Sequence, residues 1–282
     1  MRIWKKWAAA LTTRQGFRLI SPQGTAYDLT GPATAPVVVL IHGLGLTRQT
    51  WADHLPALAD HFRVLTYDLC GHGESALPAE TPSLTALSDQ LRHLMDHLHI
   101  ARAALIGFSL GGMINRRFAM DHPDRVSALV VLNSPHERSP DAQRLVKERA
   151  AASDAGPAAT IEATLDRWFT PGFRVCHPEA VAWVRASVLA NDPGNFARHR
   201  QILAHGVMEL IRPKPPITEP TLVMTCENDS GSTPAMAKAI AAEIPGARVQ
   251  IVPALQHLGL LEQPRLFTAP ILDFLASNGP AS

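Results

Sequence analysis

The chain has 282 residues, of which 46% are hydrophobic and 18% are charged, and its formal net charge at pH 7 is +1. This length suits one large domain, or a domain that carries an insertion, and the composition is typical of a globular protein that needs no disulfide or metal support. The near-zero charge excludes the strong imbalance that would indicate nucleic acid or an anionic membrane as a partner.

The N-terminal sequence and the cysteines predict a cytoplasmic protein. The apolar run 7–11 is too short for the core of a signal peptide. No stretch approaches about 18 consecutive apolar residues, so no transmembrane helix is expected. The three cysteines, Cys70, Cys176 and Cys226, are widely spaced and form no Cys-x-x-Cys pattern. This favours free thiols in a reducing compartment and predicts no metal framework.

The first half of the chain alternates between strand-like and helix-like segments. The β-branched run 37–41 is typical of a strand that is buried on both faces of a parallel sheet. Apolar residues recur at helical spacing over 48–60 and in the segment that starts near Ser83, so each predicts a helix, the second with Ser83 as its N-cap. Further strands are predicted over 17–20, 25–29, 62–67, 103–106 and 125–132.

The pattern changes between residues 133 and 218, where helical segments broken by prolines replace the alternation. We interpret 133–218 as a helical cap inserted over the sheet, and 1–132 together with 219–282 as an α/β core. The alternation of strands and helices in the core predicts a mostly parallel sheet with helices on both faces. After the cap, strands are predicted over 221–225 and 247–252, and helices over 234–244 and 264–276.

A serine lies at a predicted strand-to-helix turn, in the sequence Gly107-Phe108-Ser109-Leu110-Gly111. Such a turn strains the backbone of the serine and leaves its hydroxyl clear at the end of the sheet. Glycine on either side avoids collisions at so tight a bend. A glycine-rich turn without chemistry would show the same five residues, so the interpretation depends on an acid, a base and a second oxyanion donor elsewhere.

Ligands in open α/β sheets bind beyond the carboxyl ends of the strands, so polar residues that follow the predicted strands are candidate site residues. Five strand ends carry such residues: His42-Gly43-Leu44, Asp68 with Gly71-His72-Gly73, Ser109, Glu227-Asn228-Asp229, and Gln256-His257. The chain order of Ser109, Asp229 and His257 is the serine, acid, histidine order of α/β-hydrolases.

Several separate motifs make the sequence similar to the α/β-hydrolase superfamily over residues 16–276. They are His42-Gly43, Asp68-x-x-Gly71-His72-Gly73, Gly107-x-Ser109-x-Gly111-Gly112, Asp229 before Thr233-Pro234, and His257 before Glu262-Gln263-Pro264. Within the superfamily the chain most resembles the 3-oxoadipate enol-lactonases. The segments 167–171, 191–193 and 257–264 carry this closer match. The chain departs from the family pattern at Cys70, where Arg is usual, at Cys226, where Gly is common, at Gln256, where Ala is frequent, and over 196–211.

The resemblance implies a serine hydrolase that cleaves a small ester or lactone and needs no metal or organic cofactor. Ser109 would attack the carbonyl carbon, His257 would take its proton, and Asp229 would orient and stabilise His257. The backbone N–H groups of Leu44 and Leu110 would bind the oxyanion of the tetrahedral intermediate.

The predicted cap supplies candidate substrate contacts. Trp168 and Trp183 either line a substrate pocket or only fill the core of the cap. An enol-lactone substrate carries a carboxylate, so the resemblance implies one cation in the pocket. The candidates, each of which is otherwise a surface charge, are Arg138, Arg167, Arg174, Arg185, Arg198 and Arg200.

Two of the assignments have competitors in the sequence. Glu227 or Asp53 could replace Asp229 as the acid, although chain order favours Asp229. His42 and His72 lie in turn motifs, where a structural hydrogen-bonding role is the expected one.

Other interpretations of the chain remain open at this stage. Asp89, His93 and His97 lie four residues apart on one helix face, a spacing that can bind a metal but is also typical of a solvated face. The same triad would serve an enzyme that hydrolyses a carbon–carbon bond, or a cofactor-free perhydrolase of the haloperoxidase type. A non-enzymatic ligand receptor on this fold is the third possibility. Product assays on each substrate class distinguish the enzymes, and slow turnover with tight retention of ligand would indicate the receptor.

Overall fold

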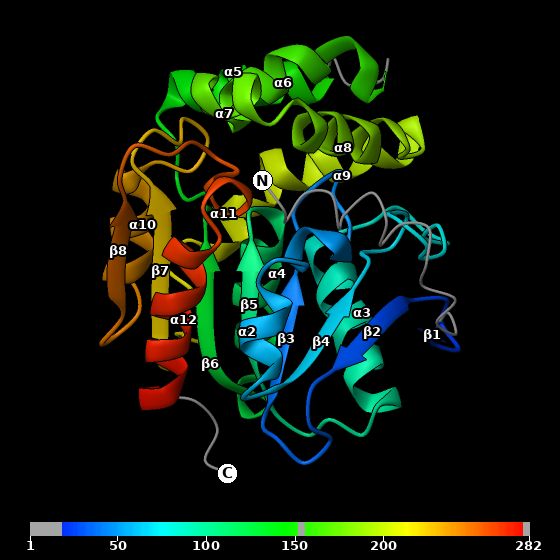
Figure 1. The fold of residues 1–282 in the computed structure, drawn as a ribbon, viewed down its shortest axis with the longest axis vertical. Coiled ribbons are helices and arrows are strands. Elements are labelled where there is room, and N and C mark those ends of the chain that lie inside the picture. The colour runs from blue at the N-terminus through cyan, green and yellow to red at the C-terminus, as the bar shows by residue number, and fades with distance from the viewer. Residues whose placement is uncertain (1–18, 152–155, 279–282) are drawn as a thin grey trace.

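The computed structural model describes residues 19–151 and 156–278. The apolar run 7–11 and the first two residues of the strand predicted over 17–20 lie outside the described residues. The rest of the chain is described below with the element labels of Figure 1.

An eight-stranded sheet forms the centre of the protein, in the spatial order β1-β2-β4-β3-β5-β6-β7-β8 (Figure 1). β2 runs antiparallel to both of its neighbours, and all other neighbouring strands are parallel. This confirms the mostly parallel sheet expected from the sequence. The strands are β1 (Leu19–Ile20), β2 (Ala26–Thr30), β3 (Val37–Ile41), β4 (Arg63–Tyr67), β5 (Ala103–Phe108), β6 (Val126–Leu132), β7 (Thr221–Cys226) and β8 (Arg248–Val252).

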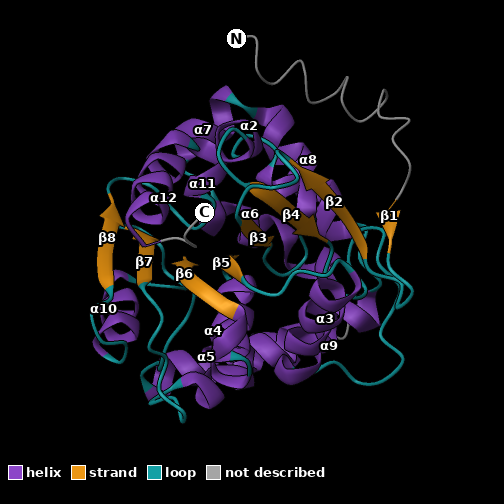
Figure 2. Ribbon diagram, turned by 90° about the horizontal axis from the view of Figure 1, so that it is seen from below, coloured by secondary structure: helices purple, strands orange, loops and turns teal. Residues whose placement is uncertain are grey.

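Helices cover both faces of this sheet, as Figure 2 shows. Helices α3, α4 and α10 pack on one face, and α2 and α12 pack on the other. The elements of the core are η1 (Arg48–Trp51), α2 (Leu55–Ala59), α3 (Leu84–His97), α4 (Leu110–Asp121), η2 (Pro123–Arg125), α10 (Pro234–Ala242), α11 (Gly259–Glu262) and α12 (Arg265–Asn278).

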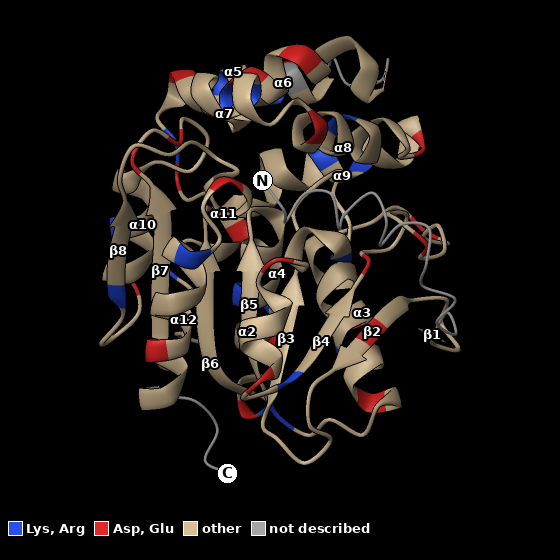
Figure 3. Cartoon of the chain, viewed as in Figure 1, with Lys and Arg blue, Asp and Glu red and all other residues tan. Residues whose placement is uncertain are grey.

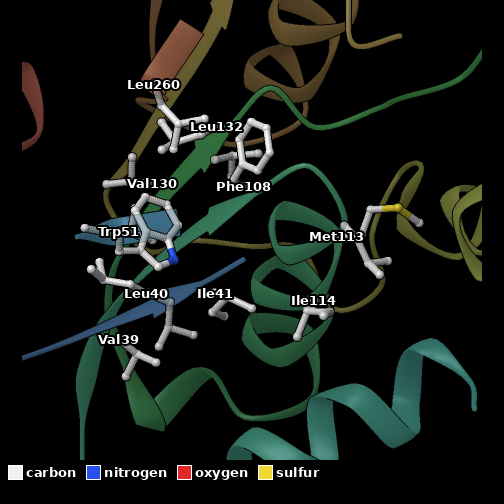
Figure 4. Packing of buried hydrophobic residues seen from close by; sticks show 14 of the residues in the cluster. Val39, Leu40, Ile41, Trp51, Phe108, Met113, Ile114, Val130, Leu132 and Leu260 are labelled. Carbon is white, nitrogen blue, oxygen red and sulfur yellow. The ribbon is translucent and has the colours of Figure 1, made fainter. Parts of the chain in front are cut away.

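Buried apolar side chains fill the interior between these layers. Trp51 packs beside Leu40 of β3 and Val130 of β6 (Figure 4), and all three side chains are at most 1% exposed. Burial of each such side chain stabilises the fold by about 1.5–3 kcal/mol. Ile41 lies opposite both Tyr67 and Gly107 in the sheet register, so β3, β4 and β5 end at the same edge. The packed strands therefore hold their following residues in fixed positions at that edge.

Helices predominate in the described residues of 133–218, and most of them lie beyond the carboxyl ends of the strands (Figure 1). The limits predicted for the core (1–132 and 219–282) and for the cap (133–218) remain a prediction. The helices of this segment are α5 (Pro140–Ala151), η4 (Pro157–Thr160), α6 (Ile161–Trp168), α7 (Pro171–Cys176), α8 (Pro178–Leu189), α9 (Pro193–His205) and η5 (Gly206–Leu210).

Two local expectations have different outcomes. Ser83 caps α3 as predicted, because its side-chain oxygen accepts the N–H of Ala86 at 3.0 Å. The single helix expected over 48–60 is instead two short pieces, η1 and α2, and Pro56 lies in the first turn of α2. Proline has no N–H to continue a preceding helix but is tolerated in a first turn. Within the described ranges, no helix has the length and apolarity needed to cross a bilayer.

Candidate active site

Ser109 occupies a strained turn between β5 and α4. Its backbone angles are φ 55° and ψ −111°, in a region that residues other than glycine rarely adopt. A Cβ atom on Gly107 would lie 2.1 Å from the carbonyl oxygen of Gly111, and one on Gly111 would lie 2.2 Å from that of Ile41. No side chain fits at either position, so both glycines are required for the close approach of β5, α4 and β3.

The structure brings Ser109, His257 and Asp229 together from three strand ends. Ser109 follows β5, Asp229 follows β7, and His257 lies in the loop after β8. His257 Nε2 lies 3.1 Å from Ser109 Oγ, and His257 Nδ1 lies 2.6 Å from Asp229 Oδ2. The three residues therefore form one continuous chain of hydrogen bonds, which can move a proton from the serine hydroxyl to the imidazole.

Four donors surround the carboxylate of Asp229, which is only 3% exposed. The N–H groups of Gly231 and Ser232 donate to Oδ1 at 2.8 and 3.0 Å, and Asn133 Nδ2 donates to Oδ2 at 2.9 Å beside the bond from His257. Burial acts to raise the pKa of Asp229, but the charge of His257 and these hydrogen bonds outweigh it and lower the pKa below its ordinary value. Asp229 is therefore an ionised partner for His257.

The competing acids are placed elsewhere. Glu227 accepts the N–H of Ala254 at 2.9 Å, in an exposed position. Asp53 lies in the turn between η1 and α2. The geometry favours Asp229 over both.

Asn133 is a site residue that the sequence interpretation missed. It directly follows β6 and lies 96 positions before Asp229 in the chain. The sequence held one signal for it, since it is a polar residue directly after a predicted strand, which is the criterion that selected Asp229 and His257.

The two predicted oxyanion donors flank Ser109. Leu110 is the first residue of α4, and N–H groups in the first turn of a helix have no partner within the helix. Leu44 follows Gly43, and both residues line the same cavity as Ser109. A Cβ atom on Gly43 would lie 3.1 Å from the Cβ of Ser109, so this turn lies directly against the serine.

His42 supports that turn through both ring nitrogens. Its Nε2 accepts the N–H of Leu69 at 3.0 Å, and its Nδ1 donates to the carbonyl oxygen of Gly43 at 2.8 Å. Burial lowers the pKa of His42, which keeps the ring neutral as this pattern requires. Burial also lowers the pKa of His72, whose Nδ1 contacts the carbonyl oxygen of Cys70 at 3.2 Å. These contacts are structural, as the sequence suggested.

A cavity of about 350 Å³ lies over Ser109 and His257. Most of its wall is apolar and comes from the core turns and from the helices of 133–218, including Leu46, Val146, Ile161, Val188, Phe196 and Leu203. An enclosed apolar wall around a few polar groups is typical of a small-molecule site.

The two candidate tryptophans have different positions. Trp168 lines the cavity, and its ring centroid lies 5.8 Å from that of His257. Trp183 does not line the cavity; it lies on α8, partly buried against the hydrophobic core. Trp168 therefore remains the better placed candidate for a substrate contact, and the position of Trp183 fits the alternative of a core residue.

Three of the six candidate arginines, Arg138, Arg167 and Arg200, line the cavity. The other three do not: Arg174 pairs with Asp166, Arg185 pairs with Glu162, and Arg198 is exposed. Figure 3 shows basic residues on α5 and on α8, where Arg185 lies.

Arg138 is half-buried in the cavity wall. Its Nη1 donates to Gln143 Oε1, a neutral acceptor, at 3.2 Å, and burial lowers the pKa of its guanidinium. Among the described residues of the wall, Asp229 is the one acidic residue, and it is bonded to His257. A partly buried cation is stabilised by a nearby negative charge, so an anionic group on a bound molecule fits this wall.

The cap contacts the loop that carries His257. The N–H of Leu258 donates to the carbonyl oxygen of Trp168 at 2.8 Å. The N–H and hydroxyl of Thr170 donate to the two carboxylate oxygens of Glu262 at 2.8 and 2.6 Å. These bonds fix the junction of α6 and α7 to the segment directly after His257.

Helix α3 does not form a metal site. Arg92 donates to Asp89 Oδ1 at 3.2 Å and contacts His93 Nε2 at 2.9 Å. The ring of His97 packs edge-on against Tyr27, at 6.3 Å between centroids. No group of three or more metal-ligating side chains occurs in the part of the chain that the structure describes.

Comparisons with known proteins agree with this architecture. The family described as "alpha/beta hydrolase fold" matches residues 36–165. A protein of Stutzerimonas stutzeri, provisionally named carbamate hydrolase RutD, is 30% identical over 89% of this chain and 97% of its own length. 3-Oxoadipate enol-lactonase 2 of Acinetobacter baylyi is 28% identical over 86% of this chain and 89% of its own. The enol-lactonase structure from Burkholderia xenovorans has a TM-score of 0.81 and 32% identity, over 89% of this chain and 96% of that one. The predicted resemblance and fold class are confirmed.

Proposed function

This chain belongs to the α/β-hydrolase family, and on that premise we propose that it hydrolyses a carboxylic ester or lactone through Ser109, His257 and Asp229. The observation that carries the proposal is the chain of hydrogen bonds from Ser109 Oγ to His257 at 3.1 Å and from His257 to Asp229 at 2.6 Å. It lies in the wall of an apolar cavity large enough for a small molecule. Relatives named as a lactonase and an esterase support the same reaction class.

The reaction begins with acylation of the serine. His257 Nε2 accepts the proton of Ser109 Oγ as that oxygen attacks the carbonyl carbon. Asp229 holds the other ring nitrogen and stabilises the imidazolium that forms. The N–H groups of Leu44 and Leu110 donate to the oxyanion, and loss of one such donor typically costs about 2.7–4 kcal/mol of the barrier.

Deacylation returns the enzyme to its starting state. His257 donates its proton to the leaving alkoxide or enolate, which departs and leaves an ester on Ser109. Water then enters and gives a proton to His257 as it attacks the acyl carbonyl. The bond between Ser109 Oγ and the acyl carbon breaks, His257 returns the proton to Ser109 Oγ, and the product acid is released.

The lining of the cavity favours a substrate ester that is mostly apolar and that also carries a carboxylate. Arg138 lines the cavity. The one acidic residue in the described wall is Asp229, and it is bonded to His257. A substrate carboxylate near Arg138 would supply the missing negative charge. An enol-lactone of an oxo acid, the substrate type in the name of the Acinetobacter baylyi relative, meets both requirements.

The experiment that tests the proposed function is labelling with a fluorophosphonate, followed by intact mass. We expect one adduct on the wild-type protein, none on Ser109→Ala and much slower labelling of His257→Ala. Ser127→Ala is the matched control, because Ser127 is a buried serine within β6 that makes no contact with the triad. No adduct on the folded wild-type protein would refute the nucleophile.

A panel of substrates then tests the reaction class. We expect turnover of short aryl esters and lactones, with a preference for those that carry a carboxylate. Turnover confined to a vinylogous diketone, or to perhydrolysis with hydrogen peroxide, would refute ester hydrolysis while leaving the triad in place.

A further inference from the structure

Asn133 joins the triad to the first turn of the cap segment. It is the residue directly after β6, and it is fully buried. Its Nδ2 donates to Asp229 Oδ2 at 2.9 Å, the same oxygen that accepts His257 Nδ1 at 2.6 Å. The two donors therefore converge on one oxygen atom of the acid.

Two of the four donors around Asp229 bind Oδ1 and the other two bind Oδ2. The N–H groups of Gly231 and Ser232 hold Oδ1, but they belong to the same short loop as the acid. Asn133 comes from another strand and is the one side chain besides His257 that the described structure places on Oδ2. It therefore ties the orientation of the carboxylate to β6, in the rigid centre of the sheet.

We propose that Asn133 is a positioning residue for the hydrolytic reaction, which holds Oδ2 of Asp229 against His257 Nδ1. This inference rests on the proposed function and extends the set of residues that it requires. Asn133 does not touch the reacting atoms; it acts through the acid, and its effect is on the rate of the chemical step.

The backbone of Asn133 supports this role. Its φ is 46°, in the left-handed region, and its N–H donates to the carbonyl oxygen of Met224 in β7 at 2.8 Å. Residues other than glycine pay a cost in this region, and asparagine tolerates it better than most. The strained backbone directs the amide toward β7 and Asp229, where a continuing strand would direct it elsewhere. Strain that is kept in a well-packed region is typical of a functional position.

The next residue makes the matching contact on the nucleophile side. Ser134 Oγ donates to the carbonyl oxygen of Ser109 at 2.9 Å, and it accepts a hydrogen bond from Arg116 at 3.1 Å. Asn133 and Ser134 thus hold the acid and the nucleophile from one turn. A displacement of this turn would change the distance between Asp229 and Ser109.

The test compares Asn133→Gly with wild type on a carboxylate-bearing aryl ester. Glycine accepts the positive φ and removes only the amide, so backbone strain does not confuse the result. We expect kcat to fall by about 10- to 100-fold, as for loss of a hydrogen bond to a charged group, and KM to change by less than about threefold. The matched control is Asn115→Ala. Asn115 is equally buried, but its Nδ2 donates to carbonyl oxygens of Leu105 and Val130, at 3.3 and 2.9 Å.

A second variant, Asn133→Asp, gives a readout that a structural role would not move. The titratable groups facing Asp229 among the described residues are His257 and Cys226, and burial raises the pKa of the Cys226 thiol to about 12, so it stays neutral. A second carboxylate here would favour protonated His257. We therefore expect the acidic limb of the kcat/KM profile to move to higher pH by at least about 0.5 unit. Asn115→Ala leaves that limb in place.

The outcomes separate the two proposals. If wild type gains no fluorophosphonate adduct at Ser109, the proposed function fails. If wild type is labelled but Asn133→Gly keeps kcat within about twofold, the positioning role is refuted. An equal loss of kcat in Asn115→Ala with no shift of the acidic limb in Asn133→Asp would also refute it, because the effect would then come from packing alone.

Discussion

The strained backbone at Ser109 should lower the free energy of unfolding of the protein. Replacement of Ser109 by glycine should raise it again. The backbone angles, φ 55° and ψ −111°, are fixed by three hydrogen bonds. The N–H of Ser109 donates to Leu132 O at 2.8 Å, and its carbonyl oxygen accepts Gly112 N–H at 3.0 Å and Ser134 Oγ at 2.9 Å. The turn cannot relax, so replacement by alanine keeps the strain and replacement by glycine removes it.

Two opposing terms give the magnitude. A residue other than glycine in such a conformation costs about 1–3 kcal/mol. Glycine adds freedom to the unfolded chain, which costs about 0.4–1 kcal/mol. Ser109→Gly should therefore be more stable than Ser109→Ala by about 1–2 kcal/mol, which for a chain of this size corresponds to a Tm higher by about 2–3 °C.

Urea unfolding of both variants measures this difference, with Ser88→Gly and Ser88→Ala as the reference pair. Ser88 is buried inside helix α3, so there glycine should be less stable than alanine by about 0.5–1 kcal/mol. The sign of the difference should reverse between the two sites. Equal stability of Ser109→Gly and Ser109→Ala, or glycine as the weaker variant at both sites, would refute the reasoning.

Three further predictions concern charge and pH. Asp229→Asn should lower kcat by about 10⁴-fold, because an uncharged amide no longer holds the required tautomer of the imidazole or stabilises the imidazolium; ester assays at high enzyme concentration measure it. Arg138→Met should raise KM for a carboxylate-bearing ester by about tenfold and leave KM for its neutral methyl ester unchanged; equal effects on both would contradict the charge assignment. Burial lowers the pKa of His54 from 6.5 to about 4, so the unfolded chain binds its proton first. Stability should therefore fall as pH drops from about 6.5 to about 4, and His54→Gln should flatten that slope in urea titrations.

The strand-end residues could be predicted because topology alone determines where they meet. Parallel strands present their carboxyl ends at one edge, so Ser109, Asp229 and His257 converge whatever the details of the loops. Asn133 obeys the same rule, but amides are common at strand ends and its partner is 96 positions away. No local pattern reveals such a pair.

The sequence was a weaker guide to which side of a helix faces the cavity and to where a helix is interrupted. Trp168 and Trp183 both lie in helices of the cap segment and both contact the core, and only packing decides that Trp168 also lines the cavity. The segment 48–60 shows the complementary limit, since its apolar spacing is helical but the lack of an N–H at Pro56 divides it.

The bonds from Trp168 and Thr170 to Leu258 and Glu262 have a consequence for exchange of parts between relatives. These bonds join the cap helices over the cavity to the loop that carries His257, although 90 positions separate Trp168 from Leu258 in the chain. A cap transplanted alone would arrive without its anchor and would leave His257 on an unsupported loop. A chimera that transfers 133–218 together with 256–264 keeps both partners of these hydrogen bonds. Exchange of the two segments together should therefore change the substrate range without loss of the support for His257.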